Sequence, residues 1–161
     1  MSSVRGGIAT VVIGATLGAA ALIASSAGAD GESSRLAPSC RGERATIAGS
    51  NGDDTLRGTS RADVIVGRAG GDAIDGRGGG DLICAGNDSD FVDGGGAKDR
   101  LYGEGGDDIL IGDESSDKLY GNNGDDAMDG QDGKMDLCIG SSGADLASGA
   151  GCERIRGATE T

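Results

Sequence analysis

Residues 102–112 read YGEGGDDILIG, a glycine-rich loop that ends in two aspartates and leads directly into three aliphatic residues. The adjacent carboxylates of Asp107 and Asp108 repel each other, and glycine adds backbone entropy that folding must remove. An interaction that offsets both costs is therefore needed wherever this arrangement occurs.

The arrangement recurs as a nine-residue repeat from Gly49 to Ser148, with one residue inserted near Lys134. Aspartate holds the sixth position of each unit, and in the first nine units a large apolar residue follows two positions later. The repeat aspartates are Asp54, Asp63, Asp72, Asp81, Asp90, Asp99, Asp108, Asp117, Asp126, Asp136 and Asp145. Glycine opens most units and often returns at the fourth position, as at Gly49, Gly52, Gly67, Gly70, Gly103, Gly106, Gly121 and Gly124. This strict register predicts a solenoid of stacked units.

Each unit predicts a turn followed by a short strand. Glycine can adopt positive φ angles in the six-residue loop, and in the three-residue strand the side chains alternate so that the middle one points inward. Two units make one coil of 18 residues, which stacks parallel strands roughly 4.8 Å apart. The sequence therefore predicts an all-β fold, a parallel β-roll, which is a right-handed β-solenoid with two nine-residue repeats per coil.

Stacking of the coils also brings the aspartates of successive coils together. Calcium takes about six to eight oxygen ligands from carboxylates and carbonyls, and it suits a flexible, all-oxygen site better than magnesium does. The alternatives are a metal-free glycine-rich solenoid and an acidic disordered tail, but neither needs a carboxylate at every ninth position. The repeat therefore predicts several bound Ca²⁺ ions.

The unit resembles the pattern G-G-x-G-x-D-x-U-x, where U is a large aliphatic residue, of the RTX or hemolysin-type calcium-binding repeat family. The resemblance covers roughly residues 49–148. The flanking stretches CRGERATIAG and SGAGCERI are also similar to those of small secreted bacterial proteins of this type. The resemblance implies that the repeat aspartates and loop glycines bind calcium.

Odd and even units, counted along the chain, supply opposite columns of loops. In the odd column a second acid, which we expect to take part in the metal site, precedes the repeat aspartate at Asp53, Asp107 and Asp125, whereas even loops carry Lys98 and Lys134. A lysine ammonium beside a carboxylate can take the place of a cation. We therefore expect the odd column to bind most of the calcium, and equal loading of both columns is the alternative.

Composition limits the classes of function. The chain has 161 residues with 34 glycines, one Phe, no Trp, no His and a formal charge of −13. The charge disfavours nucleic acid and anionic lipid as partners. The absence of histidine removes the Ser/His/Asp and Cys/His nucleophile arrangements. We expect no enzyme, because each pair of acids that could work as acid and base lies inside a repeat that already explains it.

Residues 1–29 differ from the rest of the chain. One Arg precedes the apolar run IATVVIGATLGAAALIA, and AGA at 27–29 places small residues before Asp30. These features predict a secretory signal peptide and a secreted, extracellular mature chain that does not insert into a membrane. A single membrane anchor is the alternative. The remaining boundaries are a linker at 30–39, an N-terminal cap at 40–48, the repeats at 49–148, and a C-terminal cap and tail at 149–161.

Four cysteines in an exported chain predict disulfides with three possible connectivities. We favour Cys40 with Cys84 and Cys138 with Cys152, and four free thiols are the alternative.

The cap at 40–48 has the length of one unit, with Ile47 at the inward position. Tyr102 and Tyr120 are 18 residues apart, so we expect them to stack on adjacent coils. The apolar strip around them is a partner surface, a place where a terminal segment docks, or ordinary apolar exposure.

Together these features predict a secreted calcium-binding repeat protein that folds on binding extracellular calcium. The alternative function is a cell-surface adhesion or interaction module in which calcium is purely structural. The sequence does not indicate which protein or glycan would be the partner of such a module.

Overall fold

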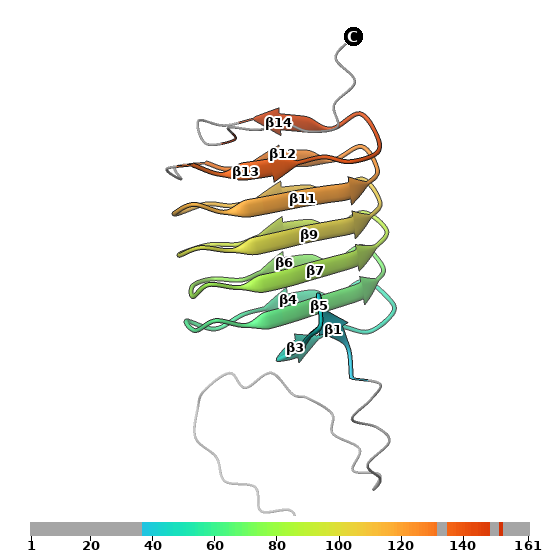
Figure 1. The fold of residues 1–161 in the computed structure, drawn as a ribbon. Helices are drawn as coiled ribbons and strands as arrows, with labels where there is room; N and C mark the ends of the chain where they lie inside the picture. Colours follow the sequence, from blue (N-terminus) through green and yellow to red (C-terminus); the bar gives the residue numbers. More distant parts are fainter. Residues whose placement is uncertain (1–36, 132–134, 149–151, 153–161) are drawn as a thin grey trace, which may run out of the picture. The chain divides into compact units, whose positions relative to one another are not determined.

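The computed structural model describes residues 37–131, 135–148 and 152. Two six-stranded parallel sheets make up most of this part, and the chain alternates between them (Figure 1). The long-strand sheet contains β3 (Ile47–Ala48), β5 (Val64–Ala69), β7 (Leu82–Asn87), β9 (Arg100–Gly105), β11 (Lys118–Asn123) and β13 (Leu137–Ile139). The short-strand sheet contains β4 (Thr55–Arg57), β6 (Ala73–Asp75), β8 (Phe91–Asp93), β10 (Ile109–Ile111), β12 (Ala127–Asp129) and β14 (Leu146–Ser148).

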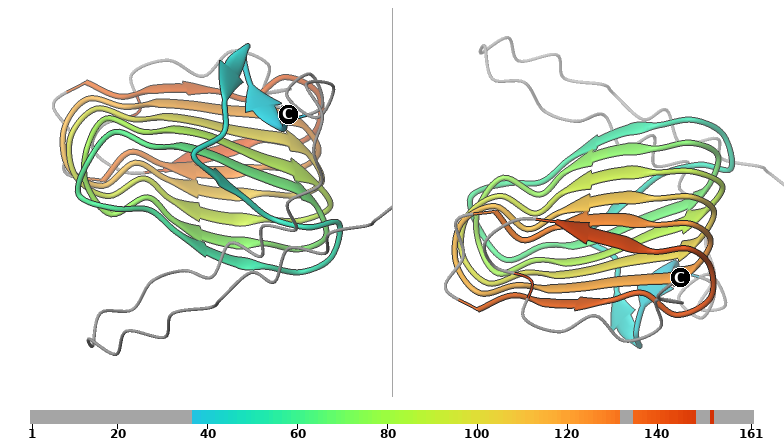
Figure 2. Two further views of the ribbon diagram at one scale, coloured as in Figure 1. Left: turned by 90° about the horizontal axis from the view of Figure 1, so that it is seen from below. Right: turned by 90° about the horizontal axis from the view of Figure 1, so that it is seen from above.

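The register of the strands confirms two repeat units per coil. Leu110 in β10 pairs with Val92 on one side and Met128 on the other, each 18 residues away in the sequence. The step from Leu119 to Cys138 takes 19 residues because of the inserted residue. The end-on views of Figure 2 show the two sheets facing each other, with loops joining them along both sides. The predicted parallel β-roll is therefore confirmed.

The middle residue of each strand fills the space between the sheets. These side chains are at most 1% exposed, and they form a single line from Ile65, Ile74, Ile83, Val92, Leu101, Leu110 and Leu119 to Met128. The alternation of side chains along a strand puts one residue of three inward, so the core is one aliphatic side chain thick on each sheet. The loops at both sides are thereby held at a fixed spacing from coil to coil.

The N-terminal segment covers part of the outer face of the long-strand sheet. β1 (Ser39–Cys40) and β2 (Glu43–Arg44) form an antiparallel hairpin, and Cys40 packs in a small cluster with Val66 and Leu82. Within the predicted cap, β3 continues the coil, because Ile47 and Ala48 pair in parallel with Ile65 and Val66 of β5. The first part of the predicted cap is thus a hairpin lying on the sheet.

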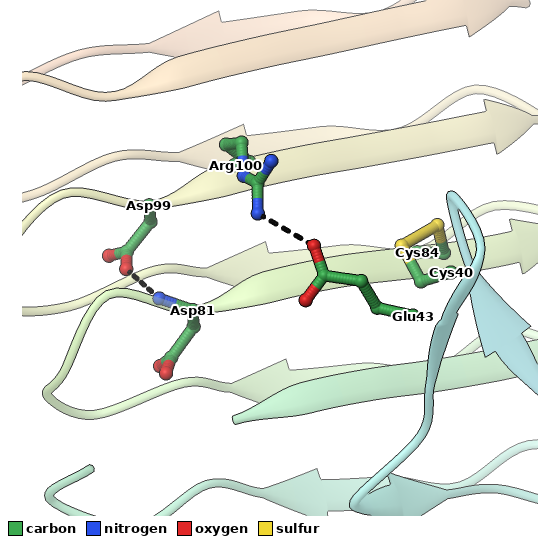
Figure 3. Close-up of polar contacts among 6 residues, drawn as sticks. All are labelled: Cys40, Glu43, Asp81, Cys84, Asp99 and Arg100. Atoms are coloured by element: carbon green, nitrogen blue, oxygen red, sulfur yellow. Dashed lines mark hydrogen bonds and ion pairs between the residues drawn. A yellow bond between two sulfur atoms is a disulfide. The ribbon is translucent and has the colours of Figure 1, made fainter. Parts of the chain in front are cut away.

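Aromatic and charged side chains fix this hairpin in place. The rings of Tyr102 and Tyr120 stack with centroids 4.6 Å apart, as predicted, and the guanidinium of Arg41 lies 4.1 Å from the Tyr102 ring centroid. An ion pair joins Arg100 of β9 to Glu43 of β2 at 3.2 Å (Figure 3). The strip around the tyrosines therefore docks a terminal segment of the same chain.

The cysteines pair as Cys40–Cys84 and Cys138–Cys152, the connectivity that the sequence favoured. The first disulfide ties the hairpin to β7 and is visible in Figure 3. The second joins β13 to Cys152, which also bridges to Asp136.

The predicted signal peptide and most of the predicted linker and C-terminal cap lie outside the described residues. The described part contains no helix that is long and apolar enough to cross a bilayer.

Candidate metal centre

The repeat aspartates form a ladder along each column of loops. From Asp72 onward, the Oδ1 atom of each accepts the main-chain N–H of the aspartate one coil earlier, as Asp99 does from Asp81 at 2.7 Å (Figure 3). The same bond recurs at 2.7 to 3.3 Å from Asp54 to Asp145, because the repeat returns each aspartate to the same place. One carboxylate oxygen of each side chain is thereby used to hold the coils in register.

The second carboxylate oxygen is buried without a hydrogen-bond partner in eight of the units. These Oδ2 atoms belong to Asp72, Asp81, Asp90, Asp99, Asp108, Asp117, Asp126 and Asp136. A buried polar atom left unpaired costs about 1–3 kcal/mol, and more where it carries charge. The eight unpaired Oδ2 atoms therefore oppose folding unless a cation binds to them.

The opening glycine of each unit makes room for this oxygen. A Cβ atom added to Gly76 would lie 2.8 Å from Oδ2 of Asp81 and 2.6 Å from the carbonyl oxygen of Gly94. One added to Gly94 would lie 2.8 Å from Oδ2 of Asp99 and 3.1 Å from the carbonyl oxygen of Gly112. A carboxylate oxygen and a carbonyl oxygen of the next coil thus converge beside five of the opening glycines, namely Gly49, Gly67, Gly76, Gly94 and Gly103.

This donor set fits calcium. Calcium accepts carboxylate and main-chain carbonyl oxygens in flexible geometry, whereas transition metals favour nitrogen or sulfur ligands. No group of three or more Cys, Asp or Glu side chains converges on one point within residues 37–131, 135–148 and 152. An ion held here must therefore take many of its ligands from the main chain.

Burial raises the pKa of seven ladder carboxyls, those of Asp72, Asp81, Asp90, Asp99, Asp108, Asp117 and Asp126. Desolvation is the largest cause, with repulsion from neighbouring carboxylates adding to it, and together they raise the pKa of Asp99 to about 8 and of Asp108 to about 7. The pKa values of Asp81, Asp90 and Asp117 rise to about 6 for the same reasons. The coil without a cation therefore holds carboxylates that resist being charged near neutral pH.

The odd and even columns of loops contain equal numbers of buried, unpaired carboxylate oxygens. Four of the eight unpaired oxygens lie in the odd units, at Asp72, Asp90, Asp108 and Asp126, and four lie in the even units. Lys98 is exposed and takes part in neither of the two ion pairs found in the described part of the chain, so it does not neutralise the adjacent Asp99. Lys134 lies outside the described residues. The expected preference for the odd column remains a prediction that this geometry does not favour.

The additional acids of the odd column do not belong to the ladder of repeat aspartates. Asp53, Asp107 and Asp125 are exposed, and Oδ1 of each accepts a main-chain N–H from the next odd loop, at 3.0, 2.9 and 2.8 Å respectively. Asp107 therefore links its loop to that of Asp125, outside the position beside the opening glycine. These acids form a second ladder that brings the loops of one column together.

The glycines at the fourth position of a unit allow the backbone of the loop to turn. Gly70, Gly106 and Gly124 have φ angles of 99°, 129° and 133°, which glycine adopts without steric cost. Gly52, in the first unit, has room for a side chain and no positive φ. Asp88 and Ala97 take this place in other loops and still adopt positive φ.

Sequence reasoning missed two features of the loops. Asp93, an outward residue of β8, has a buried Oδ1 without a partner at the edge of a shallow hollow lined by Arg57, Asp75 and Phe91. The second missed feature is the serine or threonine that follows the opening glycine in three units, Ser50, Thr59 and Ser141. The sequence does contain a signal for it, the dipeptide Gly-Ser or Gly-Thr at the start of the unit.

The comparisons with known proteins agree with this chemistry. The family model described as the RTX calcium-binding nonapeptide repeat (4 copies) matches residues 48–83, 85–118 and 102–134, more than half of the chain. No curated protein and no solved structure matches the chain. The chain therefore belongs to the family of RTX calcium-binding nonapeptide repeats, whose β-roll is a structural type that binds calcium.

Proposed function

We propose that the protein is a secreted calcium-binding protein whose repeats fold when their loops take up extracellular calcium. The observation that carries this proposal is the row of eight buried carboxylate oxygens without partners. Each adds the cost of desolvating a charge to a chain with a formal charge of −13. A bound divalent cation would supply the positive charge that offsets both.

The loop geometry supports a particular set of ligands for the ions. The Oδ2 atom of a repeat aspartate and the carbonyl oxygen that opens the unit one coil later form the two sides of the site, as Asp99 and Gly112 do beside Gly94. Oδ1 stays engaged with the preceding aspartate, so the carboxylate is oriented before an ion arrives. The coil thus positions its ligands through the same bonds that stack it.

The disulfides support a location outside the cytoplasm. Two cystines in a chain of this size indicate an oxidising environment. RTX repeats are typical of extracellular bacterial proteins. Extracellular calcium lies in the range at which modules of modest affinity fill, about 10⁻⁴–10⁻³ M, so calcium outside the cell can drive folding by mass action.

Circular dichroism during a calcium titration tests the proposal. In excess chelator we expect little β structure from the mature, disulfide-bonded chain, and a cooperative gain of β signal as calcium is added. Magnesium at the same concentration is the control, because its smaller octahedral shell suits these carbonyl-rich loops poorly. Full β structure in chelator that calcium does not change would refute calcium-driven folding.

A second candidate function, an interaction module with structural calcium, is favoured by the outer face of the short-strand sheet. Phe91, Ile109 and Leu146 are 43%, 47% and 66% exposed on it, and Phe91 and Ile109 are neighbours in register. Sedimentation of the calcium-loaded protein and of a Phe91→Ser, Ile109→Ser variant tests self-association through this face. Self-association that is seen in calcium, lost in chelator and absent from the variant would establish an interaction through this face.

A further inference from the structure

In three of the repeat loops the Oδ2 atom of the repeat aspartate has a hydrogen-bond partner, whereas in the other eight it has none. In the units opened by Gly49, Gly58 and Gly140, Oδ2 of the aspartate accepts the main-chain N–H of the second residue, Ser50, Thr59 or Ser141, at 2.6, 2.8 and 3.0 Å. We call these the closed loops. The eight units whose Oδ2 is buried without a partner are the open loops.

Hydroxyl groups strengthen the closed loops at the N-terminal end. The side chain of Ser50 donates to Oδ2 of Asp54 at 2.9 Å, and that of Thr59 donates to Oδ2 of Asp63 at 2.8 Å. Thr46 adds a bond to Oδ1 of Asp63 at 3.0 Å. The carboxylates of this first coil therefore have their hydrogen bonds supplied by the protein itself.

The backbone of the second residue separates the two classes completely. In the eight open loops it has positive φ, between 56° and 136°, at Arg68, Arg77, Gly86, Gly95, Glu104, Asp113, Asn122 and Gln131. Ser50, Thr59 and Ser141 do not adopt positive φ. Residues other than glycine adopt this conformation at a cost of order 1–3 kcal/mol, so most open loops combine backbone strain with an unpaired oxygen. The closed loops have neither.

The closed loops lie where a shared ion would lack one coil. The units of Asp54 and Asp63 are the first of their columns, and that of Asp145 is the last of the odd column, whereas the unit of Asp136, the last repeat of the even column, is open. An ion bound between coils takes oxygens from two successive loops, and an end loop has a neighbouring repeat on one side only. At three of the four column ends, hydrogen bonds from within the loop are the substitute for the missing ligands.

We infer that the closed loops take no calcium, because Ser50, Thr59 and Ser141 donate to the carboxylate oxygen that an ion would otherwise bind. Calcium is confined to the eight open loops. This inference rests on the proposed calcium binding and says which loops carry it. A serine or threonine directly after the opening glycine is then the sequence mark of a metal-free loop in this chain.

A matched pair of substitutions in one column tests the inference. Asp63 and Asp81 are both buried, lie one coil apart and each donate their main-chain N–H to Oδ1 of the aspartate one coil later, but only Asp63 is in a closed loop. Native mass spectrometry and calorimetry of the full mature chain count the bound ions. We expect Asp81→Asn to bind one ion fewer than the wild type and Asp63→Asn to bind the same number.

The second pair, Asp54→Asn and Asp72→Asn, repeats the comparison in the other column and decides the matter if Asp63→Asn does not fold. Loss of one ion from Asp54→Asn or Asp63→Asn would overturn the inference while leaving calcium binding intact. A wild type that binds no calcium would instead refute the proposed function. Circular dichroism in saturating calcium shows which variants are folded and can be compared.

Discussion

Replacing Gly94 with alanine places a methyl group where the structure leaves room for a ligand. The added Cβ would lie 2.8 Å from Oδ2 of Asp99 and 3.1 Å from the carbonyl oxygen of Gly112. Real Cβ atoms do not approach other heavy atoms to 2.8 Å, so Asp99 must move away from its place beside the carbonyl. Gly94 does not have a positive φ, so the backbone itself accepts alanine.

The size of the effect follows from the crowding. Forcing a methylene-sized group into a packed site costs about 1–3 kcal/mol. At 1.4 kcal/mol for each tenfold change, this corresponds to roughly 5-fold to 150-fold weaker calcium binding at this one site. Because each ion would be shared between coils, we also expect the midpoint of the calcium titration by circular dichroism to rise.

Gly78→Ala is the control for this substitution. A Cβ at Gly78 meets no atom within 4 Å, and Gly78 likewise has no positive φ. This alanine is expected to leave calcium binding unchanged and to stabilise the coil slightly through the unfolded state. Calorimetry that finds the same ion number and affinity for Gly94→Ala as for Gly78→Ala would refute the assignment of the ligand position.

Three further outcomes are expected. Burial raises the pKa of Asp99 to about 8 and of Asp108 to about 7, from an ordinary value of 3.8, so the metal-free coil binds more protons than the unfolded chain over this range. Its stability is therefore greatest at low pH and falls as pH rises through these values, and the β signal in chelator should increase on acidification from pH 8 towards about 5; a decrease would contradict this. Leu119→Ala, at a fully buried position, should lower the free energy of unfolding in saturating calcium by about 2–5 kcal/mol, whereas Ile109→Ala at a site 47% exposed should change it by less; chemical denaturation measures both. Replacing Cys40 and Cys84 by serine opens a loop of 44 residues, which should cost up to about 4 kcal/mol of stability; an unchanged denaturation midpoint would count against it.

The periodic features of the fold are predictable from the sequence. Ile65, Leu101 and Leu119 each stand two residues after a repeat aspartate, and all three are fully buried in the structure. A period of nine residues admits few folded forms, because turn, strand direction and inward position must all repeat with it. The fold and the identity of the ladder aspartates therefore follow from spacing alone.

The roles of individual loop residues do not follow from spacing. Asp107 and Asp108 are adjacent and chemically the same, but Asp107 is exposed and accepts an N–H, whereas Asp108 is buried with one oxygen free. The spacing identifies Asp108 as the ladder residue, but it does not indicate that Asp107 accepts the N–H of Asp125 outside the ladder. The sequence did not predict the hairpin of β1 and β2, because tertiary contacts of Arg41 and Glu43 hold it in place and the repeat does not.

The difference between closed and open loops changes how the coil is expected to assemble. The first coil has its carboxylates satisfied at Asp54 and Asp63, carries no strained second residue, and is tied through Cys40 to the second coil at Cys84. The loops from Asp72 to Asp136 lack such hydrogen bonds to Oδ2, so under the proposed function each is expected to depend on calcium and on the coil before it. Nearest-neighbour dependence of this kind makes a repeat protein fold by propagation from its most stable unit. We expect the N-terminal coil to be that unit here, and calcium to extend the ordered structure from it along both columns of loops.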